Sequence, residues 1–149
     1  MRYVPQYRLP PNIVDTTLSN LVRIANIEVR LGVSMGDGGK TLDDLKGEGY
    51  RAVFVATGTL VPRPLSIEGK LVAGADLEGV MFGLDLLSEV NQGKVSPQLF
   101  RGNRVIVVGG GNVAFDVART ARRLGGDVSL VCLENEDKSS KDGIPADVE

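Results

Sequence analysis

Three small residues with a fixed spacing follow an apolar run in the last third of the sequence. Gly109, Gly111 and Ala114 fill the positions of a G-x-G-x-x-[G/A] pattern. In this pattern the first glycine allows a tight turn and the second lets the backbone approach a pyrophosphate. The third small residue permits close packing of a helix on a strand. The pattern therefore predicts a turn that binds a dinucleotide.

The residues around this turn supply the context that the pattern requires. Residues 105–108 are an uninterrupted apolar run, typical of a parallel strand that is covered on both faces. Apolar residues recur at helical spacing after the turn, at Val113, Val117, Ala121 and Leu124. The pair Gly125-Gly126 then ends the predicted helix. The alternative interpretation is a glycine-rich turn in an α/β layer that binds no nucleotide.

We predict that backbone N–H groups in this turn, together with the positive end of the helix dipole, face the pyrophosphate of NAD(H) or NADP(H). The predicted cofactor-binding residues of the turn are Gly109, Gly110, Gly111, Asn112, Val113 and Ala114.

Two acidic residues near the turn receive different interpretations. A second apolar strand is predicted over residues 128–133, with Glu134 at its carboxyl end, where an acid can bind the ribose hydroxyls. The alternative for Glu134 is a solvated carboxylate at a strand end. Asp116 is expected in the first turn of the helix, where an acid stabilises the helix dipole.

Composition excludes several kinds of chemistry. The 149 residues contain no histidine, which excludes the usual serine and cysteine triads, His-ligated zinc and an imidazole proton shuttle. The single cysteine, Cys132, excludes an internal disulfide, a C-x-x-C pair and an iron-sulfur cluster. We expect Cys132 to be a small buried residue in a strand. We predict no metal site and no catalytic side chain.

The sequence also bears on location and partners. Apolar residues make up 42% of the chain, the net charge is -2, and no apolar run is long enough to span a membrane. Prolines at positions 5, 10 and 11 interrupt the start, which has no stretch fit for a signal peptide. The acidic residues concentrate in residues 134–149, which disfavours nucleic acid as a partner. We expect a cytoplasmic protein that binds neither membrane nor nucleic acid.

Upstream of the glycine turn, local patterns predict shorter elements. They are a helix over 12–25, a strand over 27–31, a turn over 36–39, one or two helical turns over 42–46, a buried strand over 50–56 and a helix over 82–90.

Three separated segments are similar to motifs of one family. Residues 4–10, Val-Pro-Gln-Tyr-Arg-Leu-Pro, are similar to a G-[IL]-P-x-[FY]-R-L-P motif. Residues 50–58 resemble the strand and A-T-G turn that close around a flavin, and residues 107–125 match a second dinucleotide fingerprint. The chain thus resembles the glutamate synthase small-subunit and dihydropyrimidine dehydrogenase branch of the FAD/NAD(P)-dependent oxidoreductases of the pyridine nucleotide-disulfide type.

The resemblance implies an α/β fold, part of a three-layer FAD/NAD(P)-binding, Rossmann-like architecture. It divides the chain into the distal part of an FAD domain (1–60), a crossover linker with a short helix (61–102) and the first βαβ unit of an NAD(P) domain (103–149). It also implies that Thr57, Gly58 and Arg8 bind the flavin, with Tyr7 nearby. From the residues alone, Thr57-Gly58 is a turn that ends a strand, and Arg8 lies in a proline-bracketed turn before a helix.

The family's first glycine pattern, which holds the FAD diphosphate, has no counterpart before Tyr3. We therefore expect a fragment of a flavin-dependent enzyme that passes hydride from NAD(P)H to FAD, inactive alone and completed by the rest of the enzyme or by a large catalytic subunit. One alternative is a non-catalytic module that binds a dinucleotide or a partner. A remote alternative is a P-loop-like nucleotide binder, because residues 34–41 come one residue short of the G-x-x-x-x-G-K-[ST] pattern.

Overall fold

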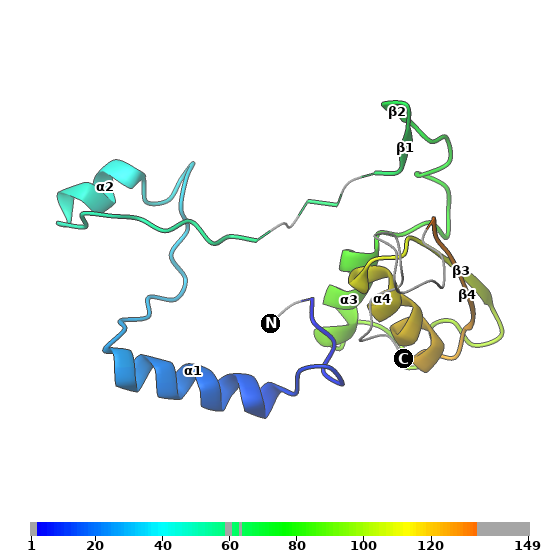
Figure 1. Ribbon diagram of the computed structural model, residues 1–149, viewed down its shortest axis with the longest axis horizontal. Helices are drawn as coiled ribbons and strands as arrows, with labels where there is room; N and C mark the ends of the chain where they lie inside the picture. Colours follow the sequence, from blue (N-terminus) through cyan, green and yellow to red (C-terminus); the bar gives the residue numbers. More distant parts are fainter. Residues whose placement is uncertain (1–2, 59–60, 63, 134–149) are drawn as a thin grey trace. The chain divides into compact units, whose positions relative to one another are not determined.

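The structure, a computed structural model, describes residues 3–58, 61–62 and 64–133 (Figure 1). It forms two compact units: unit 1 comprises residues 1–10 and 61–149, and unit 2 comprises residues 11–60. The elements in chain order are α1 (Pro11–Ala25), α2 (Leu42–Gly47), β1 (Ser66–Ile67), β2 (Lys70–Leu71), α3 (Gly83–Asn91), β3 (Arg104–Val108), α4 (Asn112–Arg123) and β4 (Asp127–Val131).

Unit 1 is built around the predicted strand-turn-helix-strand segment. Strands β3 and β4 are parallel, with Val105 opposite Val128 and Val108 opposite Val131, and α4 connects them. Helix α4 packs on the sheet and α3 lies beside α4 (Figure 1). The buried apolar residues of this core are Leu86, Leu87, Val107, Val117, Ala121 and Leu124. The expected helix over 82–90 and the α/β class are confirmed.

The sheet of unit 1 is covered on one face. Val107 points into the core and is 7% exposed, whereas Ile106 and Val108 are 68% and 62% exposed. The expectation that β3 is covered on both faces is therefore wrong for the described residues, which form two layers in place of three. Among the described residues, no element covers the face of β3 that carries Ile106 and Val108.

A pair of glycines ends α4 as predicted. Leu124 is the C-cap and Gly125 follows with φ +91°, in the left-handed region that favours glycine. The N–H of Gly125 donates to the carbonyl of Arg122 at 3.1 Å, and the N–H of Gly126 donates to that of Ala121 at 3.1 Å. This is the hydrogen-bond pattern of a Schellman motif, which satisfies carbonyls at the helix end. Strand β4 then ends at Val131, and Cys132 follows it and is partly buried. The expectation that Cys132 is a buried residue within the strand is therefore wrong.

Unit 2 contains the two predicted helices and neither predicted strand. The expected helical segments appear as α1 and α2, and Thr41 forms a reciprocal capping box with Asp44 at the start of α2. Residues 27–31 and 50–56 form no strand, and residues 50–56 are exposed. Both strand predictions were wrong, because a strand needs a neighbouring strand to satisfy its backbone groups and the described residues of unit 2, 11–58, provide none.

A short hairpin lies in the segment that was expected to be a linker. Strands β1 and β2 are antiparallel, and Glu68 and Gly69 connect them with φ values of +50° and +77°. Two successive positive φ values are typical of a type I′ hairpin turn. Within residues 3–58, 61–62 and 64–133, no helix is both long and apolar enough to cross a membrane.

Candidate functional site

The glycine turn lies between the end of β3 and the start of α4. Gly109 has φ +130°, a conformation that side chains disfavour, and its N–H donates to the carbonyl of Val131 at 2.8 Å. A Cβ on Gly109 would lie 3.3 Å from the Cβ of Ala114. The first and third small residues of the pattern therefore allow β3 and α4 to pack closely, as the sequence predicted.

Gly111 is different, because nothing in the structure crowds it. It is the N-cap of α4 with φ -81° and ψ 168°, and an added Cβ would meet no atom within 4 Å. Its carbonyl accepts from the N–H of Ala114 at 2.9 Å and from that of Phe115 at 3.3 Å. No steric contact and no positive φ therefore requires glycine here, although glycine is favourable at an N-cap. The open space beside Gly111 would also allow a ligand to come close to the backbone.

The start of α4 is open to solvent. Gly111, Asn112 and Val113 are exposed, whereas Gly110 is buried. The first amides of a helix have no partner within the helix and carry the positive end of its dipole. An exposed helix start after a glycine turn can therefore bind a phosphate group through backbone N–H groups.

Thr57 and Gly58, the predicted flavin-binding pair, lie in unit 2. Gly58 has φ +75°, so its backbone conformation already favours glycine, and an added Cβ would meet no atom within 4 Å. Thr57 and Gly58 are both exposed. Their flavin-binding role stays a prediction, and so does that of Glu134, which lies outside the described residues.

Arg8, the third predicted flavin ligand, contacts α4 of unit 1. Its Nε lies 2.9 Å from Oδ1 of Asp116, whose side chain is only 12% exposed. The Tyr7 hydroxyl lies 3.3 Å from the backbone carbonyl of Asp116 and 3.4 Å from its Oδ1. The Nδ2 of Asn91 in α3 donates to the carbonyl of Val4 at 2.8 Å. These contacts fix residues 4–8 against the α3–α4 pair.

The expectation for Asp116 was wrong. Asp116 is the fifth residue of α4, which has no acidic residue in its first turn, and its partner comes from the N-terminal segment. The sequence did hold a signal for this pairing. Asp116 precedes Val117 and stands one turn before Thr120 on the face of α4 that is buried, and a buried carboxylate requires a partner.

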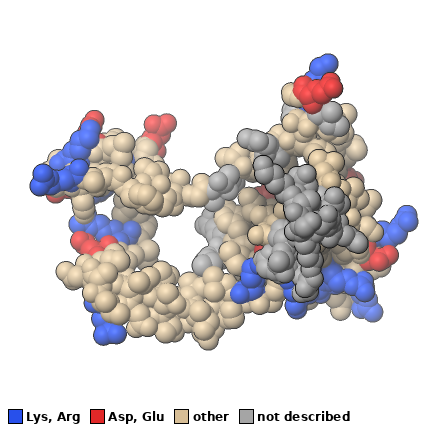
Figure 2. Space-filling view, viewed as in Figure 1, with Lys and Arg blue, Asp and Glu red and all other residues tan. Residues whose placement is uncertain are grey.

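Two arginines of α4 lie over the ring of Tyr7. The guanidinium carbons of Arg119 and Arg123 lie 5.3 Å and 4.3 Å from the ring centroid, within cation–π range. Burial raises the pKa of Tyr7 above its ordinary value, and the Asp116 carboxylate also acts in that direction. Basic side chains are visible along the lower edge of unit 1, over the end of α4 (Figure 2). Arg119, Arg122 and Arg123 are all exposed, and Arg119 and Arg123 also contact the ring of Tyr7.

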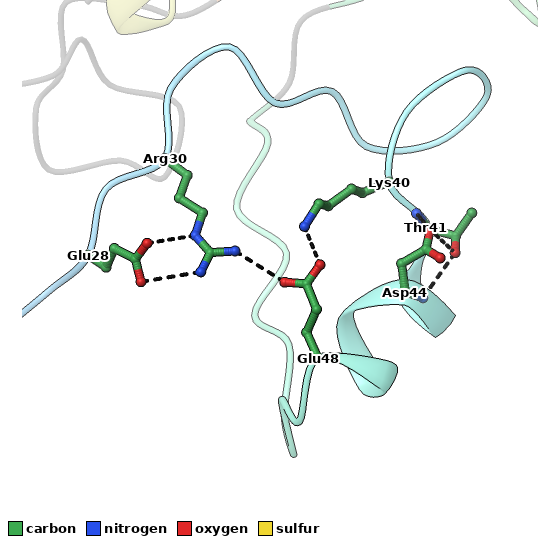
Figure 3. A network of polar contacts seen from close by, with 6 residues as sticks. All are labelled: Glu28, Arg30, Lys40, Thr41, Asp44 and Glu48. Carbon is green, nitrogen blue, oxygen red and sulfur yellow. Dashed lines mark hydrogen bonds and ion pairs between the residues drawn. The ribbon is translucent and has the colours of Figure 1, made fainter.

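The P-loop-like segment of unit 2 is occupied by its own ion pairs. Lys40, which a phosphate loop needs for its ligand, pairs with Glu48, and Arg30 bridges Glu48 at 3.1 Å and Glu28 at 2.8 Å (Figure 3). Lys40 holds the pKa of Glu48 below its usual range, and Arg30 does the same for Glu28. Residues 35–43 surround an open hollow of about 630 Å³. However, α2 is six residues long and gives no extended helix dipole.

Comparison with known proteins bears on the whole chain. A family model described as pyridine nucleotide-disulphide oxidoreductase matches residues 7–140. The β subunit of NADP(+)-dependent formate dehydrogenase from Moorella thermoacetica is 34% identical over 125 residues, which cover 82% of this chain and 16% of that protein. The β subunit of NADPH-Fe(3+) oxidoreductase from Geobacter sulfurreducens is 29% identical over 146 residues, which cover 97% of this chain and 20% of that protein.

A third relative is a putative glutamate synthase [NADPH] small chain from Cereibacter sphaeroides. It is 29% identical over 151 residues, which cover 97% of this chain and 34% of that protein. The chain thus spans between 16% and 34% of the length of these three curated relatives.

Proposed function

The chain belongs to the pyridine nucleotide-disulphide oxidoreductase family, which uses FAD and NAD(P)H, and from this premise we propose that it binds NAD(P)H in a flavin-dependent oxidoreductase through the turn at residues 109–114. The proposed enzyme is similar to the small subunit of glutamate synthase. The observation that carries the proposal is Gly111: it is exposed, unstrained and uncrowded, and it caps an open helix start. Glycine at such a position lets a phosphate group come close to the backbone.

Each part of the turn has a physical role in this proposal. Gly109 allows the chain to reverse direction between β3 and α4, and Ala114 lets the two elements approach. The exposed N–H groups at Gly111 and Asn112 donate to the pyrophosphate, and the dipole of the 12-residue α4 favours its negative charge. The bound cofactors supply the chemistry, a hydride transfer from NAD(P)H to FAD. The protein contributes position and electrostatics, so the proposal requires no catalytic acid or base from this chain.

We further propose that Thr57 and Gly58 contribute to the flavin side of the enzyme and that Glu134 binds the adenosine ribose. The family match extends over residues 7–140 and includes all three positions. The proposal includes partner subunits, and its support is that the relatives are named as β or small chains. The non-catalytic alternative, a module that binds a dinucleotide without turnover, shares the same nucleotide site. It predicts nucleotide binding with no NAD(P)H oxidation even when the rest of the enzyme, FAD and an artificial electron acceptor are present.

The substitution Gly111→Ala tests the nucleotide site. The new methyl group occupies the space where a phosphate would approach, and hydrogen bonds to a charged group contribute about 1.5–3 kcal/mol each. We expect the affinity for NADH or NADPH to fall about tenfold or more, measured by isothermal titration calorimetry. The fold should remain, because φ -81° suits alanine and nothing lies within 4 Å. Alanine is a poorer N-cap than glycine, at a cost of about 1 kcal/mol or less.

Gly47→Ala is the matched control. Gly47 ends α2 in unit 2, has no positive φ and has no atom within 4 Å of an added Cβ. We expect unchanged nucleotide affinity in this variant. Equal affinities in the wild type and a folded Gly111→Ala variant would contradict the proposed site.

A further inference from the structure

The contact between the N-terminal segment, residues 4–10, and α4 involves a charged pair that is largely removed from water. The carboxylate of Asp116 is 12% exposed and the side chain of Arg8 is 29% exposed, with Nε and Oδ1 2.9 Å apart. A buried carboxylate that loses its cation is strongly destabilised. Arg8 therefore stabilises α4 at Asp116, although 108 residues separate the two partners.

The arginines of α4 itself are directed elsewhere. Arg119 and Arg123 stack on the ring of Tyr7, and a guanidinium nitrogen of Arg122 donates to the carbonyl of Gly126 at 3.1 Å. The cation that faces Asp116 thus comes from the N-terminal segment. The Tyr7 hydroxyl adds a second contact, at 3.3 Å from the backbone carbonyl of Asp116.

The position of Asp116 places these contacts near the glycine turn. Asp116 is one helical turn beyond Asn112, the first residue of α4. The same part of α4 is tightly packed against α3, because a Cβ on Gly83 would lie 2.6 Å from Cγ2 of Val117. A helix held closely at residues 116 and 117 has a defined axis, and that axis determines where its first amides point.

The Arg8–Asp116 pair lies close to the point where the chain passes from unit 1 to unit 2. Residues 1–10 belong to unit 1, and the chain enters unit 2 at Pro11. Arg8 is therefore three residues before the point where the chain leaves the nucleotide-binding unit for the unit that holds Thr57 and Gly58.

We propose that the Arg8–Asp116 pair couples the N-terminal segment to the start of α4, so that docking of the segment raises the affinity of the glycine turn for NAD(P)H. Arg8 and Asp116 are then positioning residues, which act through the orientation of α4 and touch no cofactor in this role. The inference rests on the proposed nucleotide site. Because coupling between sites is reciprocal, nucleotide binding also strengthens the docking of the segment.

A double-mutant cycle on the full chain tests the coupling. The variants are Arg8→Gln, Asp116→Asn and the double variant, titrated with NADH and with NADPH by calorimetry. We expect each single variant to bind about fivefold more weakly or worse, and the double variant to bind no more weakly than the weaker single variant. Arg8→Lys, which restores a positive charge, should recover part of the affinity. Arg30→Gln, which breaks the exposed ion pairs with Glu28 and Glu48 in unit 2, is the matched control and should bind as the wild type does.

Amide hydrogen exchange separates a positioning role from a general loss of structure. In Arg8→Gln, exchange should accelerate at residues 112–116 while the amides of β3 and β4 stay protected. Wild-type affinity in Arg8→Gln, or loss of protection throughout β3 and β4, would overturn the coupling. If instead the wild type binds neither nucleotide, or Gly111→Ala binds as tightly as the wild type, the proposed nucleotide site itself fails. The two failures are therefore distinguishable.

Discussion

Strand β3 of unit 1 and residues 50–56 of unit 2 are both rich in apolar residues, but the two units bury their apolar side chains differently. In unit 1, Leu86, Leu87 and Ala121 are at most 2% exposed. In unit 2, no residue between positions 11 and 58 is buried, and Leu31 and Phe54 are 88% and 93% exposed. The family match covers both regions alike. The difference shows that an apolar pattern determines a strand only where another element is present to cover and pair with it.

The partner elements explain this contrast physically. Strand β3 has β4 as a hydrogen-bonded neighbour and α4 as a cover, all within 28 residues of sequence from Arg104 to Val131. Residues 27–31 and 50–56 have strand-like sequences but no neighbouring strand within the part of the chain that the structure describes. Large exposed apolar side chains are typical of a surface that another part of an assembly covers.

The largest expected difference between the two regions is in amide hydrogen exchange. Amides of the β3–β4 ladder and of the last turns of α4 should exchange at least about a hundredfold more slowly than those of residues 27–31 and 50–56, because opening them requires unfolding of the core. Exchange followed by mass spectrometry measures both sets in one sample. Equal protection of the two sets would show that unit 2 forms a sheet of its own.

Two truncations of apolar side chains test the same contrast through stability. Leu87→Ala removes a side chain that is 2% exposed and should lower the free energy of unfolding by about 2–4 kcal/mol. Phe54→Ala removes a larger side chain that is 93% exposed and should change it by less than about 0.5 kcal/mol. Urea unfolding followed by circular dichroism measures both values. A loss in Phe54→Ala comparable to that in Leu87→Ala would mean that Phe54 is buried in solution.

An element could be predicted from the sequence where its interacting residues lie close together in the chain. The glycine turn, α4, its Schellman end and the parallel strand pair depend on residues close in sequence, and they were predicted correctly. Segments 27–31 and 50–56 were wrongly predicted as strands, because strand pairing depends on residues that are distant in sequence. The hairpin at Glu68-Gly69 was also missed, although its turn is local, because Gly69 was assigned to a linker.

The same distinction between local and distant residues applies to the candidate site. Gly109, Gly111 and Ala114 were found from spacing alone, and the structure gives each a distinct geometry. The Arg8–Asp116 pair was missed because its partners are 108 residues apart, and Asp116 was assigned to a helix dipole that it does not cap. An acidic residue on the buried face of an amphipathic helix predicts that a cation exists, but it does not predict where in the sequence that cation is.

The smallest expected effect concerns the segment that joins the two regions. Burial raises the pKa of Tyr7 above 10.0, and the nearby carboxylate of Asp116 also raises it, while the Thr120 hydroxyl and Arg119 oppose the shift. The folded protein therefore holds the phenolic proton more tightly than the unfolded chain does. The stability linked to this proton is fully present below about pH 10 and is lost as the pH rises through the folded-state pKa.

Titration of tyrosinate absorbance in the wild type and in Tyr7→Phe gives the Tyr7 curve by difference. Its midpoint should lie above that of the same residue in urea, and segment 4–10 should dissociate from α4 over that pH range. A midpoint at or below the value in urea would show that Tyr7 is solvated, and that in solution residues 4–10 resemble the exposed segments of unit 2.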